Sequence, residues 1–337
     1  ESIQKCIINY SQVAAMYTGI PLRWPKPMQD FFAFQGAIST IGEHLVNPDC
    51  TTQLSAADLF YSKQMVYLIF PFVLIFIVYI IWKSYAYVTG NEWSRHGSKK
   101  TKVSHKGQEW SSRNYVNVKD KFVVTVCVVI YLLYPTLAKQ AFSLFTCIEV
   151  NGKSYLLADL AEECKVGRHS TYAIFVGLPQ LLIFVAGLPL IGLFFLHRNR
   201  YRLETMPVKA RYGLLFGGYK SDRYFWEFCL ILRKVCVIAI SSFGASMDAE
   251  IQTLLLIMVL ILCSALQHAG QPYDTSATHL LPNLEMAVLF MLIMTLWSGL
   301  MMFKLNDSGN DSGTESSKSV HVSLTMITVV TNVLFVI

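Results

Sequence analysis

Three ionisable residues occupy a stretch of this sequence that is otherwise apolar. Glu227, Arg233 and Lys234 lie inside or beside the apolar run 228–244. Charges at the depth of a lipid bilayer are costly and often carry a function. On a helix, Glu227 and Lys234 are seven residues apart and share one face, whereas Arg233 points about 100° away from Lys234.

Three interpretations of these charges remain open at this point. The long stem of Lys234 could bend back toward a water interface, which the aromatic run 224–226 would mark. The cations could instead form a buried ion pair with a neighbouring helix, and Glu285, which opens the apolar run 286–303, is a candidate partner. They could also line an ion pathway or act as gating charges.

Proline and glycine residues inside apolar runs form a second set of candidates. A proline removes a backbone donor and can kink its helix, and kinked membrane helices can open into ion sites or gates. Proline is also simply commoner in membrane helices than in soluble ones. Gly-Leu-Pro occurs twice, at 177–179 and 187–189, so the run 172–196 is the best hinge candidate. The hinge candidates are Pro71, Pro135, Pro179, Gly187 and Pro189.

Motifs of enzymes are absent from the sequence. It has no GxSxG, HExxH, P-loop, kinase signature or dinucleotide-binding fingerprint, and its eight histidines are scattered. No CxxC pair or helical His pair indicates a metal site. We therefore expect a protein that is not an enzyme and that has no catalytic residues, no cofactor and no metal.

The composition indicates a membrane protein. Of 337 residues, 53% are hydrophobic and 15% are charged, against about 25% charged in an ordinary soluble domain. The mean hydropathy is +0.43. These values disfavour a soluble enzyme, a disordered tail and a fibrous protein. The net charge of +6 does not indicate nucleic acid as a partner, because the basic residues flank the apolar runs.

Long uncharged or nearly uncharged runs predict the fold. A membrane-spanning helix needs about 20 mostly apolar residues. Residues 6–20 are a doubtful candidate, since this run is short and contains Asn9, Ser11 and Gln12. We predict an all-α, polytopic membrane helix bundle with seven to eight spans and a small disulfide-linked extracellular loop region. The other seven runs are 65–82, 122–138, 172–196, 228–244, 251–266, 286–303 and 321–337.

Basic residues predict the orientation of the bundle. The loop 83–121 holds nine Lys or Arg and the loop 197–223 holds seven, so both should face the cytoplasm. The expected outward segments are 21–64, 144–171, 245–250 and 304–320. The chain then divides into a doubtful span with an extracellular segment (1–64), membrane helices with the loops 83–121 and 144–171 (65–196), a basic cytoplasmic linker (197–223), and membrane helices with the loop 304–320 (224–337).

Sequons and cysteines agree with this orientation. Asn306 and Asn310 begin two N-glycosylation sequons, and both lie in an expected outward segment. Cys50, Cys147 and Cys164 also fall on the outward side, where disulfides persist. Cys147 and Cys164 would close one compact loop, which makes them the predicted pair. Pairing of Cys50 with either of them is the alternative.

An ordered set of short motifs resembles one family. The set comprises Asn9-Tyr-Ser-Gln12, Trp24-Pro25, Pro48-Asp-Cys50, Leu133-Tyr-Pro-Thr136, Phe145-Thr-Cys147, Tyr155-Leu-Leu-Ala-Asp159, Cys164, Gly187-Leu-Pro189, Tyr212-Gly-Leu-Leu, Gly218-Tyr219, Phe225-Trp-Glu, Arg233-Lys234, Gln271-Pro-Tyr and Asn283-Leu-Glu285. Its order is similar to the C-terminal multi-pass module of large protist surface proteins with ephrin-receptor-like cysteine-rich ectodomains. That module is often described as TRP-like, after transient receptor potential channels. The cysteine repeat modular proteins of apicomplexan parasites look similar in layout.

The resemblance implies a function for a larger protein. It implies an ectodomain and one further span upstream of Glu1, and the end at Ile337 inside an apolar stretch also suggests an excerpt. The leading expectation is a TRP-like module acting in cation conduction or in relay of an ectodomain signal. The alternatives are a non-conducting receptor or adhesion anchor, and a transporter or lipid-handling protein. No selectivity-filter motif stands between the last runs, and polar residues within the runs are few, which keeps the anchor alternative open.

The same interpretation predicts the partners and the cellular location of the protein. The partners would be membrane lipids, the N-terminal ectodomain of the same chain and other membrane subunits, with no nucleic acid. The location would be the cell membrane or another membrane of the secretory pathway.

The charge pattern makes the orientation testable. Protease added to intact cells should cut within 304–320 and spare 83–121, because the basic loops are expected inside. Mapping the fragments by mass spectrometry checks this. Cleavage in the opposite pattern would overturn the predicted topology.

Overall fold

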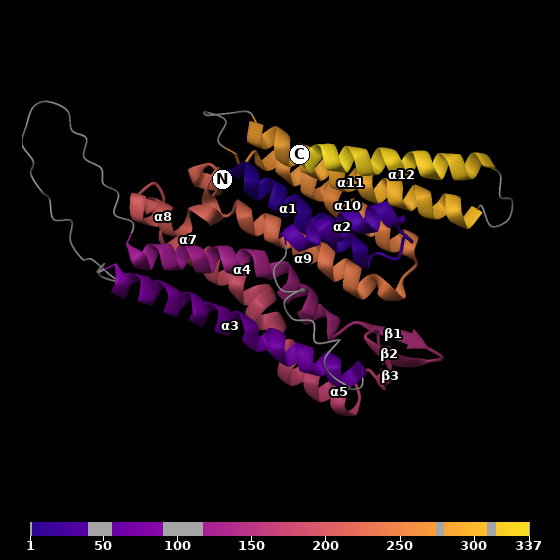
Figure 1. The fold of residues 1–337 in the computed structure, drawn as a ribbon, viewed down its shortest axis with the longest axis horizontal. Helices are drawn as coiled ribbons and strands as arrows, with labels where there is room; N and C mark the ends of the chain where they lie inside the picture. The colour runs from indigo at the N-terminus through magenta and orange to yellow at the C-terminus, as the bar shows by residue number, and fades with distance from the viewer. Residues whose placement is uncertain (1, 40–55, 90–116, 274–279, 309–314, 337) are drawn as a thin grey trace, which may run out of the picture.

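A computed structural model describes residues 2–39, 56–89, 117–273, 280–308 and 315–336. Helices make up most of these residues, and one small sheet interrupts them (Figure 1). The α-helices are α1 (Ser2–Met16), α2 (Lys26–Ser39), α3 (Ala56–Val88), α4 (Val118–Ser143), α5 (Gly167–Tyr172), α6 (Leu178–Gln180), α7 (Leu188–Arg198), α8 (Met206–Phe216), α9 (Trp226–Phe243), α10 (Ala249–Gly270), α11 (Leu280–Ser308) and α12 (Glu315–Val336). The strands are β1 (Cys147–Val150), β2 (Lys153–Leu156) and β3 (Asp159–Glu163).

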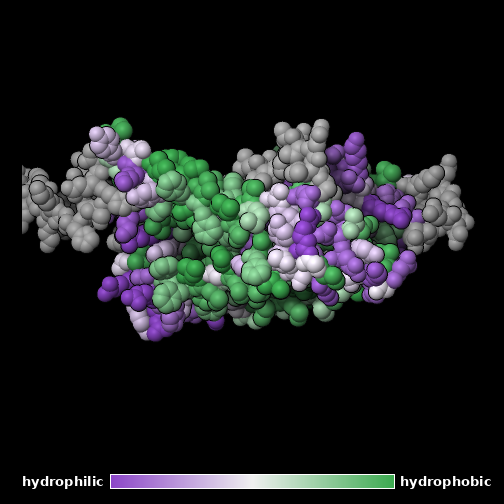
Figure 2. Space-filling view, turned by 90° about the horizontal axis from the view of Figure 1, so that it is seen from below, coloured by the Kyte–Doolittle hydropathy of each residue, from purple (hydrophilic) through white to green (hydrophobic). Residues whose placement is uncertain are grey.

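Six helical stretches are long and apolar enough to cross a membrane. They are Ala57–Val88, Val118–Ser143, Gly167–Arg198, Ser221–Ser246, Ala249–Gly270 and Leu280–Asn306. Each contains one of the predicted runs, so the polytopic helical fold is supported for these six. Figure 2 shows apolar side chains gathered over the middle of one face, with hydrophilic ones toward both ends.

The predicted total of seven to eight spans is not confirmed. The apolar part of α12, Ser319–Phe335, has 17 residues and falls below the length of the six. The doubtful run 6–20 forms α1, which has 15 residues, followed by the short 3-10 helix Tyr17–Gly19. Both helices nevertheless pack along spans: α12 lies beside α11, and α1 contacts α9 and α11.

The helices form two groups that share α4 and α9 as their boundary. One group contains α3, α4 and the segment 167–198, and the other contains α1, α2 and α9–α12 (Figure 1). The main hydrophobic core lies in the second group. Its centre is made of fully buried residues from five helices, namely Tyr10, Phe32, Val237, Leu256 and Leu292 with their neighbours.

The two ends of the bundle differ in structure. The sheet and the short helix η7 (Gly244–Ser246) meet at one end, which we call the sheet end. Helix α8 lies at the opposite end of the long axis, which we call the α8 end (Figure 1). The described parts of the predicted outward segments 144–171 and 245–250 gather at the sheet end, and the predicted cytoplasmic linker 197–223 lies at the α8 end.

The short sheet was not predicted from the sequence, which favoured an all-α fold. It has the order β1-β2-β3 with antiparallel pairing, and Cys147 lies opposite Leu156 in its register. Asn151 and Gly152 both have positive φ in the β1–β2 turn, which is typical of a tight hairpin. The hairpin is too short to show the alternating pattern that identifies longer strands.

The segment 167–198 is one continuous helical path with two wide turns. The π-helical stretches η3 (Ala173–Gly177) and η4 (Leu181–Gly187) each end at the glycine of a Gly-Leu-Pro motif. A proline cannot donate a backbone hydrogen bond, and its ring clashes with the carbonyl four residues earlier, so a wider turn relieves the conflict. The predicted hinge residues Pro179, Gly187 and Pro189 therefore mark the irregular turns. Pro71 and Pro135 instead lie inside the continuous helices α3 and α4.

Two glycines provide a test of how closely the helices approach. A Cβ at Gly299 in α11 would overlap the ring of Trp24, which is held by a hydrogen bond from its Nε1 to the carbonyl of Tyr17 at 2.9 Å. A Cβ at Gly213 in α8 would meet no atom within 4 Å.

We expect Gly299→Ala to destabilise the fold by about 1–3 kcal/mol through overpacking. Gly213→Ala should be neutral or stabilising by up to about 1 kcal/mol, because alanine is the better helix former. Thermal unfolding of the purified protein in detergent measures both. Equal effects of the two substitutions would contradict the close contact between α11 and Trp24.

Candidate functional site: a buried charge network

Five charged side chains are buried together between α1, α9 and α11. We call Lys5, Glu227, Arg233, Lys234 and Glu285 the charge network. The least buried of them, Lys5, is 8% exposed. Removing such groups from water costs several kcal/mol per ion unless each finds a partner, so their contacts decide how the helices pack.

Helix α1 runs alongside α9 with a constant register. Lys5 is paired with Glu227, Gln12 accepts a hydrogen bond from Lys234, and a Cβ at Gly19 would touch Ser241. The residues of each pair are 222 positions apart in the sequence. Contacts repeat every seven residues, which is the period at which two parallel helices keep the same faces together.

The first ion pair lies at the α8 end of this interface. Lys5 from α1 forms a salt bridge with Glu227 at the start of α9. The hydroxyl of Tyr219 donates a hydrogen bond to Glu227 Oε2 at 2.8 Å, and the ring of Tyr219 lies under Lys5 Nζ at 5.0 Å. Burial raises the pKa of Tyr219 well above its usual value, and the nearby Glu227 carboxylate raises it further, so its hydroxyl stays a donor.

The second ion pair joins α9 to α11. Arg233 Nη1 donates to Glu285 Oε1 at 2.9 Å, and the two side chains are 2% and 0% exposed. The sequence had proposed Glu285 as a partner if these helices were neighbours, and the structure makes them so. Glu285 Oε2 and Arg233 Nη2 have no hydrogen-bond partner among the described residues, so the pair is held by one bond.

Lys234 is bound differently. Its Nζ donates to Gln12 Oε1 at 2.6 Å and lies 4.6 Å from the centre of the Tyr131 ring in α4. The Tyr131 hydroxyl in turn donates to Asn9 of α1 at 2.5 Å. An amide oxygen and an aromatic face thus replace a carboxylate as the contacts of this cation.

The interpretation in which Lys234 bends back to the interface is wrong in this structure. Lys234 is 1% exposed, and its amine points to α1 and α4 instead of to water. The partners Lys5, Gln12 and Tyr131 were missed by the sequence analysis. A usable signal existed, because Asn9 and Gln12, two of the polar residues that made the run 6–20 a poor span, are three residues apart and so share a helix face. Gln12 binds Lys234 of α9, and Asn9 binds Tyr131 of α4.

Backbone contacts close the α8 end next to the network. Tyr219 and Tyr273 form an isolated antiparallel bridge, and the amide of Lys220 donates to the carbonyl of Pro272 at 2.8 Å. Burial raises the pKa of Tyr273 as well, and the Glu285 carboxylate adds to the rise. Helix α8 is tied to α4 by an ion pair between Arg211 and Asp120.

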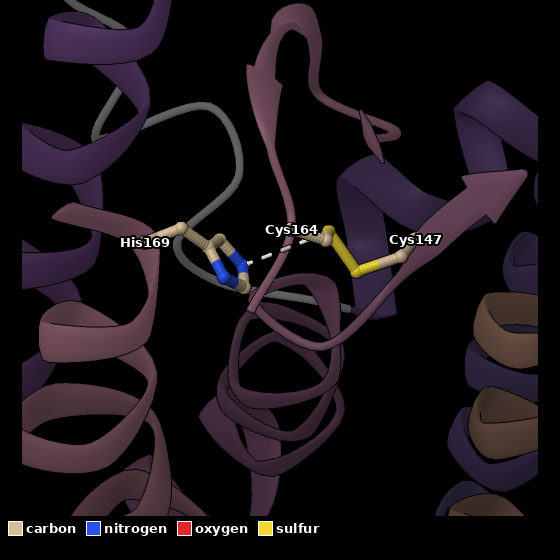
Figure 3. Close-up of side chains that lie close together, drawn as sticks. All are labelled: Cys147, Cys164 and His169. Carbon is tan, nitrogen blue, oxygen red and sulfur yellow. Dashed lines mark hydrogen bonds between the residues drawn. A yellow bond between two sulfur atoms is a disulfide. The ribbon is translucent and has the colours of Figure 1, made fainter. Parts of the chain in front are cut away.

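The sheet end carries a disulfide and a surface cluster. Cys147 and Cys164 are bonded to each other, as the sequence predicted, and His169 lies beside them (Figure 3). Nδ1 of His169 accepts from the amide of Lys165 at 3.0 Å, so Nε2 is left to donate to the carbonyl of Leu144 at 3.0 Å. The three side chains lie at metal-ligand spacing, but both sulfur atoms are taken by the disulfide.

The cluster next to the disulfide connects the sheet to the helices. Arg168 at the start of α5 forms ion pairs with Asp58 of α3 at 2.7 Å and with Glu162 of β3 at 3.2 Å. The Tyr61 hydroxyl donates to Glu162 at 3.2 Å, and its ring stacks on Tyr172 with centroids 4.2 Å apart. A displacement of β3 would therefore reach both α3 and α5.

The remaining predicted residues lie apart from the network. Asn306 is exposed in the last turns of α11, so the start of the expected loop 304–320 is helical. Cys50 and Asn310 lie outside the described residues, as does most of the basic loop 83–121. Use of the sequons and the role of the hinge residues stay predictions.

Comparison with known proteins identifies a distant relative. Over 220 residues the chain is 24% identical to cysteine repeat modular protein A of Toxoplasma gondii. The match covers 62% of this chain and 7% of that protein, so the chain spans a small fraction of the relative's length. No protein-family model and no solved structure match the chain. The similarity agrees with the resemblance to cysteine repeat modular proteins, as a distant relation, and is silent on any TRP-like character.

The contacts of Glu227 give a direct test of the network. Glu227→Gln should lower the free energy of unfolding by about 3–5 kcal/mol, because it leaves Lys5 buried without its counter-charge. Adding Lys5→Met should restore part of the loss. Adding Lys234→Met instead should restore less, since Lys234 contacts Gln12 and not Glu227. Denaturant unfolding in detergent, analysed as a double-mutant cycle, measures the coupling.

The exposed ion pair at the sheet end is the matched control. Asp58 and Arg168 are 45% and 44% exposed and are screened by water, so Asp58→Asn should lower the free energy of unfolding far less than Glu227→Gln does. Purely additive losses for Lys5→Met and Glu227→Gln would show that this pair does not interact.

Proposed function

We propose that this chain is the membrane module of a larger surface protein and that it relays conformational changes between its two ends. The observation that carries the proposal is the charge network, which joins α1, α9 and α11 through buried ion pairs and reaches α4 through Tyr131. Helices tied in this way must move together, because separating them would leave charges unpaired in a low-dielectric interior.

Contacts at the sheet end supply an input for such a relay. The sheet touches η7, which connects α9 to α10, and β3 is bound to α3 and α5 through Glu162. Helix α5 continues into the two wide turns of 167–198, which are the irregular part of this path. In the predicted orientation this end faces outward, where an ectodomain would act on it.

Contacts at the α8 end supply an output. Glu227 accepts a hydrogen bond from the hydroxyl of Tyr219, and Tyr219 pairs with Tyr273. The first turn of α9 is therefore joined both to the linker that precedes α9 and to the segment that follows α10. A shift of α9 along α1 would thus change the position of the linker that precedes it. In the predicted orientation this linker is cytoplasmic.

Cation conduction is the competing function that the resemblance suggests. Polar residues of the spans would then face a water-filled path. Three polar residues inside the predicted runs have partners inside the protein instead: Asn9 binds Tyr131, Gln180 donates to the carbonyl of Gln64 at 2.9 Å, and Asn332 accepts from Thr295 at 3.1 Å. This favours a relay over a pore within one copy of the chain. Single-channel recording after reconstitution tests it, and unitary cation currents would contradict our proposal.

The relay predicts long-range coupling that a passive anchor lacks. Removing the disulfide with Cys147→Ser and Cys164→Ser should loosen the sheet and raise amide exchange severalfold in residues 217–223 at the α8 end. Hydrogen–deuterium exchange of the protein in nanodiscs measures this. The same pair of substitutions in a Lys5→Met/Glu227→Gln background should leave exchange in 217–223 unchanged, because the link through α1 and α9 is cut.

The outcome separates the relay from the anchor. If loss of the disulfide changes exchange only in the sheet and α5, the two ends are not coupled and the chain is better described as an anchor. A Ser246→Ala variant near the sheet, which removes only a hydroxyl bonded to the carbonyl of Phe243, controls for unspecific effects at this end.

A further inference from the structure

A groove lies between α7 and α9 on the outside of the bundle. Its volume is about 690 Å³, which is within the range of ligand sites in proteins. Leu190 and Phe194 of α7 and Leu232 of α9 line it, and each of these side chains is at least 60% exposed. Both helices belong to stretches long enough to cross a membrane, so this α7–α9 groove faces lipid chains.

The α7–α9 groove has a mouth and a deep end. Helix α7 ends and α9 begins at the α8 end of the bundle, so His197 and Tyr224 stand at the mouth. Leu190 lies seven residues before His197, and Leu232 lies eight residues after Tyr224, which places the deep end about 10–12 Å from the mouth. Mostly leucine and phenylalanine side chains line the groove between these levels. The groove therefore suits a hydrocarbon chain that lies along the helices.

Polar groups at the mouth are arranged so that one hydroxyl proton is free. Arg200 Nη1 lies 3.2 Å from His197 Nε2, and a guanidinium can only donate, so Nε2 accepts this hydrogen bond. The proton of the neutral His197 ring is then on Nδ1, which donates to the hydroxyl oxygen of Tyr224 at 2.9 Å. The Tyr224 hydroxyl therefore keeps its own proton for a further acceptor.

Positive charge gathers next to the mouth. Arg198, Arg200 and Arg202 are exposed, and none of the three forms an ion pair within the part of the chain that the structure describes. Tyr201 is 86% exposed beneath the guanidinium of Arg200, at 4.7 Å, and an exposed aromatic ring at the end of a span is typical of the head-group level of a membrane. Planar guanidinium groups bind phosphate through two parallel hydrogen bonds. In the predicted orientation this end is cytoplasmic, where the membrane leaflet carries anionic lipids.

We propose that the α7–α9 groove binds one anionic phospholipid of the surrounding membrane. One acyl chain lies along the groove, and the phosphate accepts hydrogen bonds from Arg200 and from the Tyr224 hydroxyl, while Arg198 and Arg202 add positive charge. The sequence predicts membrane lipids in general as partners, and the groove assigns a class of lipid and a place to one of them. The site stands apart from the proposed relay, because lipid binding and coupling between the ends are measured separately and each can fail alone.

Native mass spectrometry of the delipidated chain, released from detergent, tests the site with three probes. Dioleoyl phosphatidylglycerol is anionic, and dioleoyl phosphatidylcholine has the same chains and a phosphate but no net charge. Glycerol 3-phosphate is an anionic head group without chains. We expect phosphatidylglycerol to bind about tenfold more tightly than phosphatidylcholine, and glycerol 3-phosphate to show no measurable binding.

Substitutions then place the binding at the mouth of the groove. Arg200→Gln should weaken phosphatidylglycerol binding about tenfold and bring it close to that of phosphatidylcholine. Tyr224→Phe keeps the ring and removes the free hydroxyl, so it should weaken binding about two- to tenfold. Lys209→Gln is the matched control, because it removes one exposed positive charge from α8 at the same end without touching the lining of the groove.

A further variant tests the hydrocarbon part of the site. Cys229→Trp fills the middle of the groove from an exposed position of α9, so it should weaken the binding of both phospholipids by a similar factor. Thermal unfolding of each variant checks that the fold is kept. Equal binding of the two phospholipids, binding of glycerol 3-phosphate as tight as that of phosphatidylglycerol, equal effects of Arg200→Gln and Lys209→Gln, or unchanged binding in Cys229→Trp would each overturn the proposal.

Discussion

The packing of this bundle depends on the cost of burying charge between α1 and α9. Lys5 and Glu227 neutralise one another, Arg233 is neutralised by Glu285, and Lys234 is held by an amide and an aromatic ring. Apolar helices can slide past one another in lipid at little cost, because lipid chains and apolar side chains are alike. Buried charges remove that freedom, since only one register pairs them all, and this explains the constant spacing between α1 and α9.

The two ends of the bundle are built in contrasting ways. At the sheet end, an exposed cluster around Arg168 fixes a small sheet to α3 and α5, and a disulfide closes the sheet on itself. At the α8 end, buried tyrosines connect the network to the linkers. Between them runs the segment 167–198, whose wide turns at the two Gly-Leu-Pro motifs make it the least regular path across the bundle.

Much of the site was accessible from residue types and spacing, and the remainder was hidden for a physical reason. Glu227, Arg233, Lys234 and Glu285 could be singled out because charge in an apolar run is rare and costly. Their partners on α1 could not be identified from the sequence. A hydropathy scale counts Asn9 and Gln12 against a membrane span whether or not another helix supplies their hydrogen bonds. The doubtful span was thus the very element that completes the network. Snorkelling of Lys234 was a sound local expectation that the neighbouring helices overruled.

The sequence by itself determined the class of the protein: long uncharged runs must form helices in lipid, because unpaired backbone groups are too costly there. It also predicted the disulfide, since Cys147 and Cys164 close a short loop, although pairing with Cys50 stayed open until the structure showed the bond. It singled out the two Gly-Leu-Pro motifs where the irregular turns occur, since proline cannot donate a backbone hydrogen bond, but it also named Pro71 and Pro135, which lie in regular helices. Only the tertiary structure decided which charges pair, that a small sheet caps one end, and that apolar side chains of α7 and α9 line one groove. Those features join residues far apart in the chain, and no local pattern records such contacts.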